Sequence, residues 1–220
     1  MAKIVPAKPL LILLYGFPGA GKTFFARQLC EQLVATHVHG DRMRMELFDN
    51  PTYSKEESHV INGLMQYMTG EFLQAGVSVV YDTNAMRVAQ RQALRNLAVK
   101  NGTETVLVWL QIDAESAFSR ASARDHRKAD DKYSRPLNRA GFDLLAGGMQ
   151  NPQPTERYQV ISGKHIFTTQ KSAMLRHLLD RGLINLDPHA GQTAKPGLVN
   201  LVPNPAAGRV DMSRRNIIIR

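Results

Sequence analysis

One segment of the chain reads Gly16-Phe17-Pro18-Gly19-Ala20-Gly21-Lys22-Thr23. It fills every fixed position of the pattern G-x-x-x-x-G-K-[ST], a loop that joins a strand to a helix and binds phosphate. In such a loop, glycines let backbone N–H groups close around anionic oxygens, the lysine reaches the β- and γ-phosphates, and the hydroxyl ligates Mg²⁺. The segment therefore predicts a nucleotide site formed by Gly16, Pro18, Gly19, Ala20, Gly21, Lys22 and Thr23.

The residues on both sides of this loop fit that interpretation. The apolar run 10–15 predicts a buried strand. Phe25, Leu29 and Leu33 recur at helical spacing. A helix from Thr23 to Val34 would direct its N-terminal dipole at bound phosphate.

Strand patterns and helix patterns alternate through the rest of the chain. Further strands are expected at 36–39, 77–81, 105–112 and 157–161, with helices between them. This alternation predicts an α/β fold with a doubly wound, parallel five-stranded sheet, a P-loop NTPase of the nucleoside/nucleotide-kinase-like type with a lid.

Length, charge and cysteine content narrow the class of protein. The chain has 220 residues, a net charge of +9 and one cysteine, Cys30. The length fits a kinase-type domain over residues 1–186, followed by a basic Pro/Gly-rich extension over 187–220. The positive charge suggests a polyanionic partner. The lone cysteine excludes a cysteine-based zinc site, and the absence of a long apolar run predicts a cytoplasmic protein with no membrane partner.

Acidic residues follow two of the predicted strands. Asp41 comes after the strand at 36–39, and Asp82-Thr83-Asn84 comes after the strand at 77–81. The carboxyl ends of parallel strands form the edge where ligands bind. Asp82 therefore has the position of a Walker B residue that would hold Mg²⁺ together with Thr23. Arg44 lies one helical turn beyond Asp41 and on the same side.

Arginines recur at helical spacing in two places. Arg87, Arg91 and Arg95 form a stripe on the helix expected at 86–100, either a solvated face or a track for phosphates. Arg120, Arg124 and Arg127 are expected along one side of the next helix. The charged residues that follow predict a lid over about residues 125–150, which would exclude water and supply cations to the transferred phosphoryl group.

The histidines do not predict a metal site. His37 and His39 share one face of their expected strand. Two ligands without a third are too few for zinc.

The bound nucleotide is best explained by a kinase. The chain has no N-K-x-D motif, with which a GTPase would read its guanine base. Asp82 is followed by Thr83 rather than by the glutamate that motor ATPases use to activate water. A kinase needs a base near the γ-phosphate and cations around it. Asp41, Arg44 and Arg124 meet these needs by position.

The ordered set of Gly16–Thr23, Asp41-x-x-Arg44, Asp82-Thr83-Asn84 and Arg120-x-x-x-Arg124 resembles the kinase domain of phage-type polynucleotide 5′-hydroxyl kinases. The resemblance covers about residues 8–150. It implies that Asp41 is the general base, that Arg44 grips the acceptor's neighbouring phosphate, and that Arg124 contacts the donor's phosphates. It also implies that the Asp82-Thr83-Asn84 segment supports the acceptor. The chain lacks the Asp-x-Asp-Gly-Thr phosphatase module often fused to such kinases and carries the basic extension instead.

The chain also resembles the wider zeta-toxin-like (AAA_33) and antibiotic-kinase group, which phosphorylates small molecules. The sequence thus predicts ATP- and Mg²⁺-dependent transfer of the γ-phosphoryl group to an alcohol. The favoured acceptor is the 5′-hydroxyl of a nucleic-acid end, and the alternative is a small-molecule hydroxyl. A third hypothesis, of another class, is a nucleotide-binding interaction protein. The predicted catalytic residues are Lys22, Asp41 and Arg124, with Arg120 on the nucleotide and Arg44, Asp82, Thr83, Asn84 and Arg87 on the acceptor.

Overall fold

The computed structural model describes residues 3–83, 86–129 and 131–185. Contacts divide the chain into two units, residues 1–185 and 186–220, and the first unit contains all the helices and strands of the described residues. The predicted extension over 187–220 and the predicted acceptor residue Asn84 lie outside the described residues.

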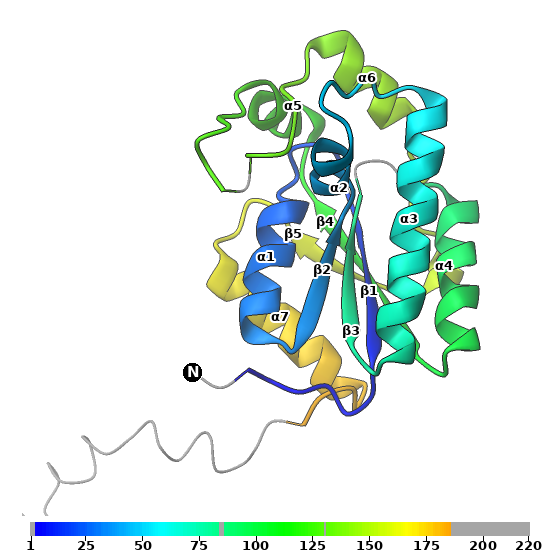
Figure 1. Cartoon of the computed structure of the whole chain (residues 1–220). Helices are drawn as coiled ribbons and strands as arrows, with labels where there is room; N and C mark the ends of the chain where they lie inside the picture. Colours follow the sequence, from blue (N-terminus) through cyan, green and yellow to red (C-terminus); the bar gives the residue numbers. More distant parts are fainter. Residues whose placement is uncertain (1–2, 84–85, 130, 186–220) are drawn as a thin grey trace, which may run out of the picture. The chain divides into compact units, whose positions relative to one another are not determined.

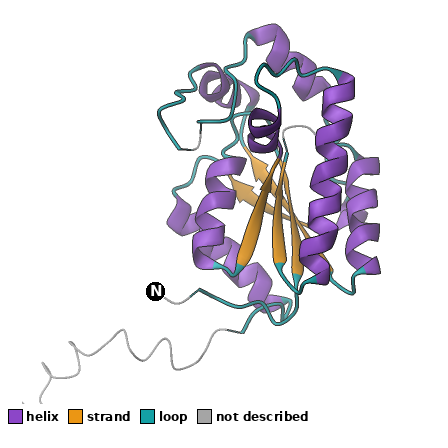
Figure 2. Ribbon diagram, viewed as in Figure 1, coloured by secondary structure: helices purple, strands orange, loops and turns teal. Residues whose placement is uncertain are grey.

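The described residues form one parallel sheet of five strands in the order β2-β3-β1-β4-β5. Figure 2 shows these strands enclosed by helices. The predicted doubly wound α/β fold is confirmed. The strands are β1 (Leu10–Tyr15), β2 (Ala35–His39), β3 (Ser78–Asp82), β4 (Glu104–Gln111) and β5 (Tyr158–Ser162).

Helices cover both faces of the sheet (Figure 1). On one face lie α1 (Lys22–Gln32) and α7 (Phe167–Asp180), and on the other lie α3 (Lys55–Gln74) and α4 (Val88–Lys100). Successive side chains of a strand point to opposite faces. Ile12 and Leu14 therefore join the core under α1, while Leu11 and Leu13 join the core under α3.

The remaining helices lie beyond the carboxyl ends of the strands (Figure 1). They are α2 (Gly40–Leu47), α5 (Ala114–Ser122) and α6 (Arg139–Gly147), and a 3₁₀ turn, η1 (Pro154–Glu156), precedes β5. From β1 the chain crosses to β2 on one side, returns to β3, and then continues to β4 on the other side. A reversal of this kind opens a crevice at the carboxyl end of the central strand, where the phosphate-binding loop follows β1.

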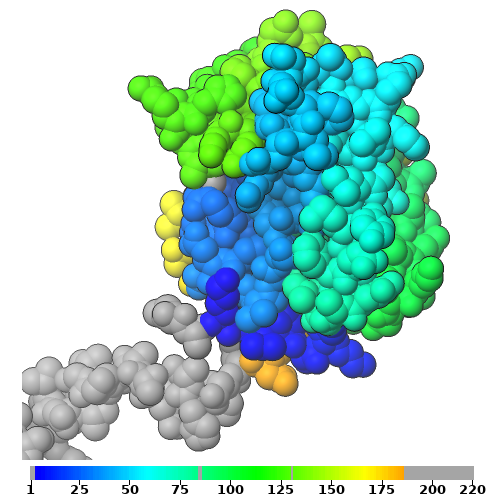
Figure 3. All heavy atoms as spheres, in the orientation of Figure 1, coloured from blue at the N-terminus to red at the C-terminus, as the bar shows by residue number. Residues whose placement is uncertain are grey.

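The helix α5 is shorter than predicted. Asp113 caps its N-terminus as expected, with its carboxylate accepting from the Ser116 N–H. At the other end, the Leu137 N–H of the returning chain donates to the Ala121 carbonyl, which replaces a further helical turn. Arg124 and Arg127 therefore lie in the following loop, and the predicted helical row with Arg120 is wrong. This loop, green in Figure 3, projects above the blue surface of α1.

No helix in the described part of the chain is both long and apolar enough to cross a bilayer.

Candidate functional site

The phosphate-binding loop is pressed against the ends of two other elements. A Cβ on Gly16 would lie 2.5 Å from the Leu110 carbonyl oxygen, and one on Gly19 would lie 2.1 Å from the Ala117 carbonyl oxygen. Both glycines also have positive φ, +151° and +83°. Only glycine can adopt this conformation and allow so close an approach.

The N-terminus of α1 has no side-chain cap among the described residues. Its N-cap is Gly21, which makes no side-chain hydrogen bond, and its first turn contains no acidic residue. The first N–H groups and the positive end of the helix dipole therefore face the loop, as an anion site requires.

Lys22 is held inside the loop. Its Nζ donates to the carbonyls of Gly16 (2.8 Å) and Phe17 (2.9 Å), and the residue is 5 % exposed. Burial lowers the pKa of Lys22 to about 8, although Asp82 and Asp41 act in the opposite direction. The ammonium group is thus positioned within the loop and has little competing hydration.

Thr23 and Asp82 come together across two elements. The Thr23 hydroxyl donates to Asp82 Oδ2 over 2.8 Å. Burial acts to raise the pKa of Asp82, but a hydrogen bond from His37 and the nearby His39 and Lys22 hold it well below its usual range. Asp82 is therefore a carboxylate. A hydroxyl and a carboxylate are oxygen donors of the kind that Mg²⁺ prefers, so the pair fits this ion.

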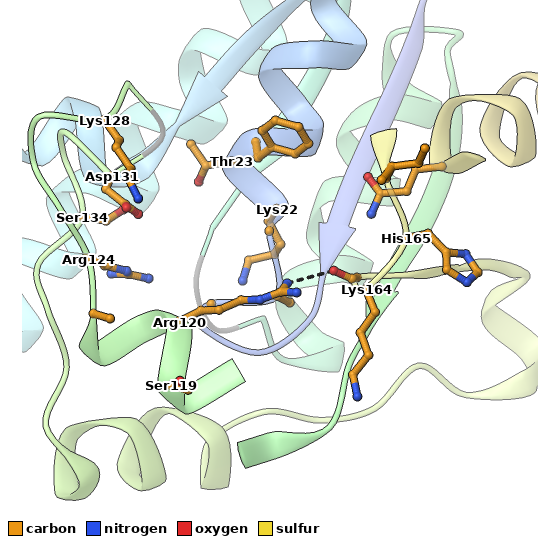
Figure 4. Close-up of a pocket in the computed structure, with 18 residues that line it drawn as sticks. Lys22, Thr23, Ser119, Arg120, Arg124, Lys128, Asp131, Ser134, Lys164 and His165 are labelled. Atoms are coloured by element: carbon orange, nitrogen blue, oxygen red, sulfur yellow. Dashed lines mark hydrogen bonds between the residues drawn. The ribbon is translucent and has the colours of Figure 1, made fainter. Parts of the chain in front are cut away.

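A cavity of about 580 Å³ lies over the loop and carries positive side chains on several sides. In Figure 4, Lys22 projects from α1, Arg120 and Arg124 reach in from the opposite side, and Lys128 comes from the loop after α5. Arg120 donates to the Gly163 carbonyl (2.8 Å), which holds it at the cavity rim. Such a lining suits a polyphosphate.

A second cavity, of about 510 Å³, contains the predicted base and those predicted acceptor residues that the structure describes. Asp41, Asp82, Thr83 and Arg87 all line it. Asp41 is the second residue of α2 and accepts a hydrogen bond from Ser134 in the loop after α5 (3.3 Å).

Arg124 joins the two cavities because it lines both of them. Its guanidinium donates to the Arg135 carbonyl (2.7 Å) within the loop after α5. Burial lowers the pKa of Arg124, and Asp41 opposes that shift. The predicted base and the predicted phosphate-binding arginine are thus electrostatic neighbours.

Arg44 lines the second cavity, but its charge is already paired. It donates to Glu57 (2.5 Å) and to Ser58, and it is 7 % exposed. Burial acts to raise the pKa of Glu57, while hydrogen bonds from Thr52 and Arg44 lower it to about 2. Arg44 lines the same cavity as Asp41, and its binding to an acceptor phosphate stays a prediction.

The predicted phosphate track on α4 is wrong for two of its three arginines. Arg91 is fully buried, where it forms a bidentate pair with Glu156, and Arg95 binds the same carboxylate. A glutamate 61 residues away in sequence from Arg95 gives no local signal of this pairing. Arg87 lines the second cavity and remains a candidate for acceptor binding.

Sequence reasoning missed several residues of the second cavity. The Tyr53 ring contacts two guanidinium groups, those of Arg44 (4.7 Å to the ring centroid) and Arg135 (3.8 Å). Its buried hydroxyl has no hydrogen-bond partner within the described residues. Lys55 lines this cavity and also escaped notice, as did Ser134, which lines the first cavity and donates to Asp41. Tyr53 and Lys55 lie on either side of Ser54, the N-cap of α3, and no catalytic motif includes them.

A family model described as an AAA domain, AAA_33, matches residues 11–140 of this chain. A search of curated proteins finds no match.

Solved kinases share this fold at low sequence identity. A sugar kinase from Janibacter sp. HTCC2649 is 15% identical, with a TM-score of 0.57 over 80% of this chain and 95% of that one. The Mycobacterium tuberculosis APS kinase CysC, in complex with AMPPNP and APS, is 15% identical, with a TM-score of 0.56 over 80% and 99%. A chain of the Pnkp1/Rnl/Hen1 RNA repair complex is 16% identical, with a TM-score of 0.54 over 68% and 45%. Identities this low establish a common fold alone.

Proposed function

We propose that this protein, which belongs to the AAA domain family AAA_33, is an ATP- and Mg²⁺-dependent phosphotransferase. It would move the γ-phosphoryl group of ATP to an alcohol, and the first candidate acceptor is the 5′-hydroxyl of a nucleic-acid end. The observation that carries the proposal is the pair of cavities that share Arg124, one over the phosphate-binding loop and one containing Asp41.

In this proposal each cavity binds one reactant. ATP places its phosphates over Lys22 and the N-terminus of α1, with Arg120 and Arg124 on the other side. Mg²⁺, held by Thr23 and Asp82, neutralises charge on the phosphate oxygens when it is bound.

The acceptor hydroxyl enters the second cavity beside Asp41, which takes its proton as the oxygen attacks the γ-phosphorus. The bond from the γ-phosphorus to the β–γ bridging oxygen breaks, and ADP is the leaving group. Arg124 lies between the two reactants and stabilises charge on the phosphoryl group in transit. The lid residue Ser134 orients the Asp41 carboxylate.

The choice of a nucleic-acid acceptor rests on charge and on motif order. Cations line the second cavity, and the chain has a net charge of +9. The order of the motifs is that of polynucleotide 5′-hydroxyl kinases, and the RNA repair complex is among the structures with this fold. The cations of the cavity are Arg44, Lys55, Arg87, Arg124 and Arg135.

A small hydroxylated acceptor is the second candidate. The volume of about 510 Å³ matches a cavity for a small molecule, and a sugar kinase shares the fold. The buried hydroxyl of Tyr53 could pair with an acceptor of either kind.

The test is transfer of labelled γ-phosphate from ATP to a 5′-hydroxyl oligonucleotide, in parallel with a pool of hydroxylated metabolites. The wild-type protein should label the oligonucleotide, and Asp41→Asn should lose roughly 10²–10⁴-fold in rate while it still binds ATP, because only proton transfer is removed. Asp49→Asn, an exposed acid near the end of α2, is the control and should retain activity.

Each other outcome has a clear meaning. Label on a metabolite alone would assign the second candidate. ATP binding without transfer to any acceptor would favour the nucleotide-binding interaction protein and contradict the proposal.

A further inference from the structure

Three side chains with metal-binding atoms converge beside the phosphate-binding loop. They are His37 and His39 on β2 and Asp82 at the end of β3, and their ligand atoms all lie within 4.8 Å of one another. Asp82 Oδ2 lies 3.1 Å from His37 Nε2 and 3.7 Å from His39 Nε2. His39 and Asp82 are buried, and the His37 side chain is 19 % exposed.

The sheet register creates this cluster. β2 and β3 run parallel with His39 opposite Asp82. Because side chains alternate along a strand, His37 points to the same face as His39. The two rings are stacked, with centroids 5.0 Å apart and planes at 7°. Both imidazoles therefore present Nε2 to one carboxylate.

We propose that His37, His39 and Asp82 form a binding site for a divalent transition-metal ion, with Zn²⁺ as the best fit. Two imidazole nitrogens and one carboxylate are a donor set that zinc accepts, whereas Mg²⁺ prefers oxygen ligands alone. Ligands at about 2.0–2.1 Å around a tetrahedral ion lie roughly 3.3 Å from one another. The observed separations from Asp82 Oδ2 bracket this value.

The cluster leaves room for a fourth ligand. His39 and Asp82 line the second cavity, so a water molecule can approach the ion from that side. Three protein ligands and one open position are the usual arrangement of zinc sites that are accessible to solvent.

This site would compete with the predicted Mg²⁺ site because the two share Asp82. Thr23 donates to the same Oδ2 atom that faces both imidazoles. An ion bound by the histidines would draw Asp82 away from Thr23 and block phosphoryl transfer. This consequence rests on the proposed function, whereas the metal site itself does not.

Cobalt titration tests the site without any need for activity. Co²⁺ added to the purified full chain should produce the intense visible bands of a tetrahedral site at one equivalent, and Zn²⁺ should abolish them. His37→Gln keeps a side chain that can donate a hydrogen bond to Asp82 but lacks the imidazole ligand, so it should weaken Co²⁺ binding at least 10-fold. His59→Gln, an exposed histidine on α3, is the control and should bind like the wild type.

Two results would overturn the proposal. One is the absence of a tetrahedral spectrum in the wild-type protein, and the other is equal affinity in the wild type and His37→Gln, with circular dichroism showing that both are folded. Either would leave the histidines as hydrogen-bond partners that orient Asp82.

Activity measurements separate this inference from the proposed function. Zn²⁺ should inhibit phosphoryl transfer in the wild type, and excess Mg²⁺ should relieve the inhibition. In His37→Gln, inhibition relative to the variant's own zinc-free rate should need at least 10-fold more Zn²⁺. A cobalt spectrum in a protein without transferase activity would retain the metal site and reject the kinase.

Discussion

Charge at the site depends on individual contacts of buried residues. Asp82 is 2 % exposed and still ionised, because Thr23 and His37 donate hydrogen bonds to its carboxylate. Lys22 is similarly buried, and the Gly16 and Phe17 carbonyls satisfy its ammonium group. In the proposed reaction, phosphate oxygens would take over these contacts from the carbonyls.

Lys22→Ala should abolish most of the transferase activity. The change removes a buried cation that faces the developing charge, which corresponds to a loss of roughly 10²–10³-fold in kcat. Lys8→Ala removes an exposed lysine before β1 and is the matched control. Full activity of Lys22→Ala in the labelled-phosphate assay would show that the loop has no part in the reaction.

At the scale of elements, the loop after α5 supplies residues to both cavities. Arg124 lines both cavities, and Ser134 donates to Asp41. In the same loop Arg127 pairs only locally, with Asp125, and its side chain is 90 % exposed. Two arginines three residues apart therefore have different predicted roles.

Arg124→Ala should slow phosphoryl transfer by roughly 10²-fold, with a smaller effect on the Kd for ATP, because Lys22 and Arg120 still face the nucleotide. Arg127→Ala should leave the rate within about twofold. Rates of single-turnover transfer at saturating ATP make the comparison. Equal effects of the two substitutions would mean that the loop acts only through its overall charge.

A buried ion pair joins α4 to the segment that precedes β5. Glu156 accepts two hydrogen bonds from the fully buried Arg91 and one from Arg95. Glu156→Ala should lower the free energy of unfolding by about 3–5 kcal/mol, because it leaves a buried guanidinium without its partner. Glu115→Ala breaks an exposed pair with Arg139 and should have a much smaller effect, because solvent screens that pair. Urea unfolding at neutral pH measures both.

The contribution of Glu156 should also depend on pH. Burial acts to raise its pKa, but Arg91 and the Gln153 N–H lower it to about 2, compared with 4.5 for an ordinary glutamate. A carboxyl group whose pKa is lower in the folded state stabilises the protein above its unfolded pKa and loses that effect as the pH falls. The stability difference between wild type and Glu156→Gln should therefore shrink between about pH 4.5 and pH 2. A constant difference across this window would contradict the assigned pairing.

At the scale of the whole molecule, the chain has a net charge of +9, and several of its arginines are paired inside the fold. Arg91 and Arg95 share the single carboxylate of Glu156, and Arg44 is paired with Glu57. Lys55, Arg87 and Arg135 remain as cations around the second cavity. Within the described residues, these cations gather at the second cavity, whereas Arg91 and Arg95 on α4 share Glu156.

Binding of a 5′-hydroxyl oligonucleotide should weaken with salt. Each phosphate contact contributes roughly 0.7 to the slope of log Kd against log salt for a single strand, so two or three contacts predict a slope between about 1.4 and 2.1. Arg87→Ala should reduce this slope by about 0.7, whereas Arg95→Ala should leave it unchanged. A salt-independent Kd would favour the small-molecule acceptor.

Local pattern was sufficient for the architecture and for the nucleotide side of the site. The run before Gly16 has the length and hydrophobicity of a buried parallel strand, and the glycine spacing is set by backbone conformation within the loop itself. The positions of Asp41 and Asp82 after their strands follow from the rule that parallel strands share a carboxyl edge. Each of these features depends only on residues adjacent in sequence.

Contacts between distant residues required the folded chain. Arg91 and Glu156 are 65 residues apart, Asp41 and Ser134 are 93 apart, and the register of β2 against β3 places His39 opposite Asp82. Periodicity shows which residues share a helix or strand face but not which side chain of another element meets that face. The arginine stripe therefore left a solvated face or a phosphate track as alternatives, and the two histidines gave no sign of the carboxylate beside them. Tertiary packing supplied the partner in both cases, Glu156 for the arginines and Asp82 for the histidines, because partner choice depends on contacts between elements rather than on local propensity.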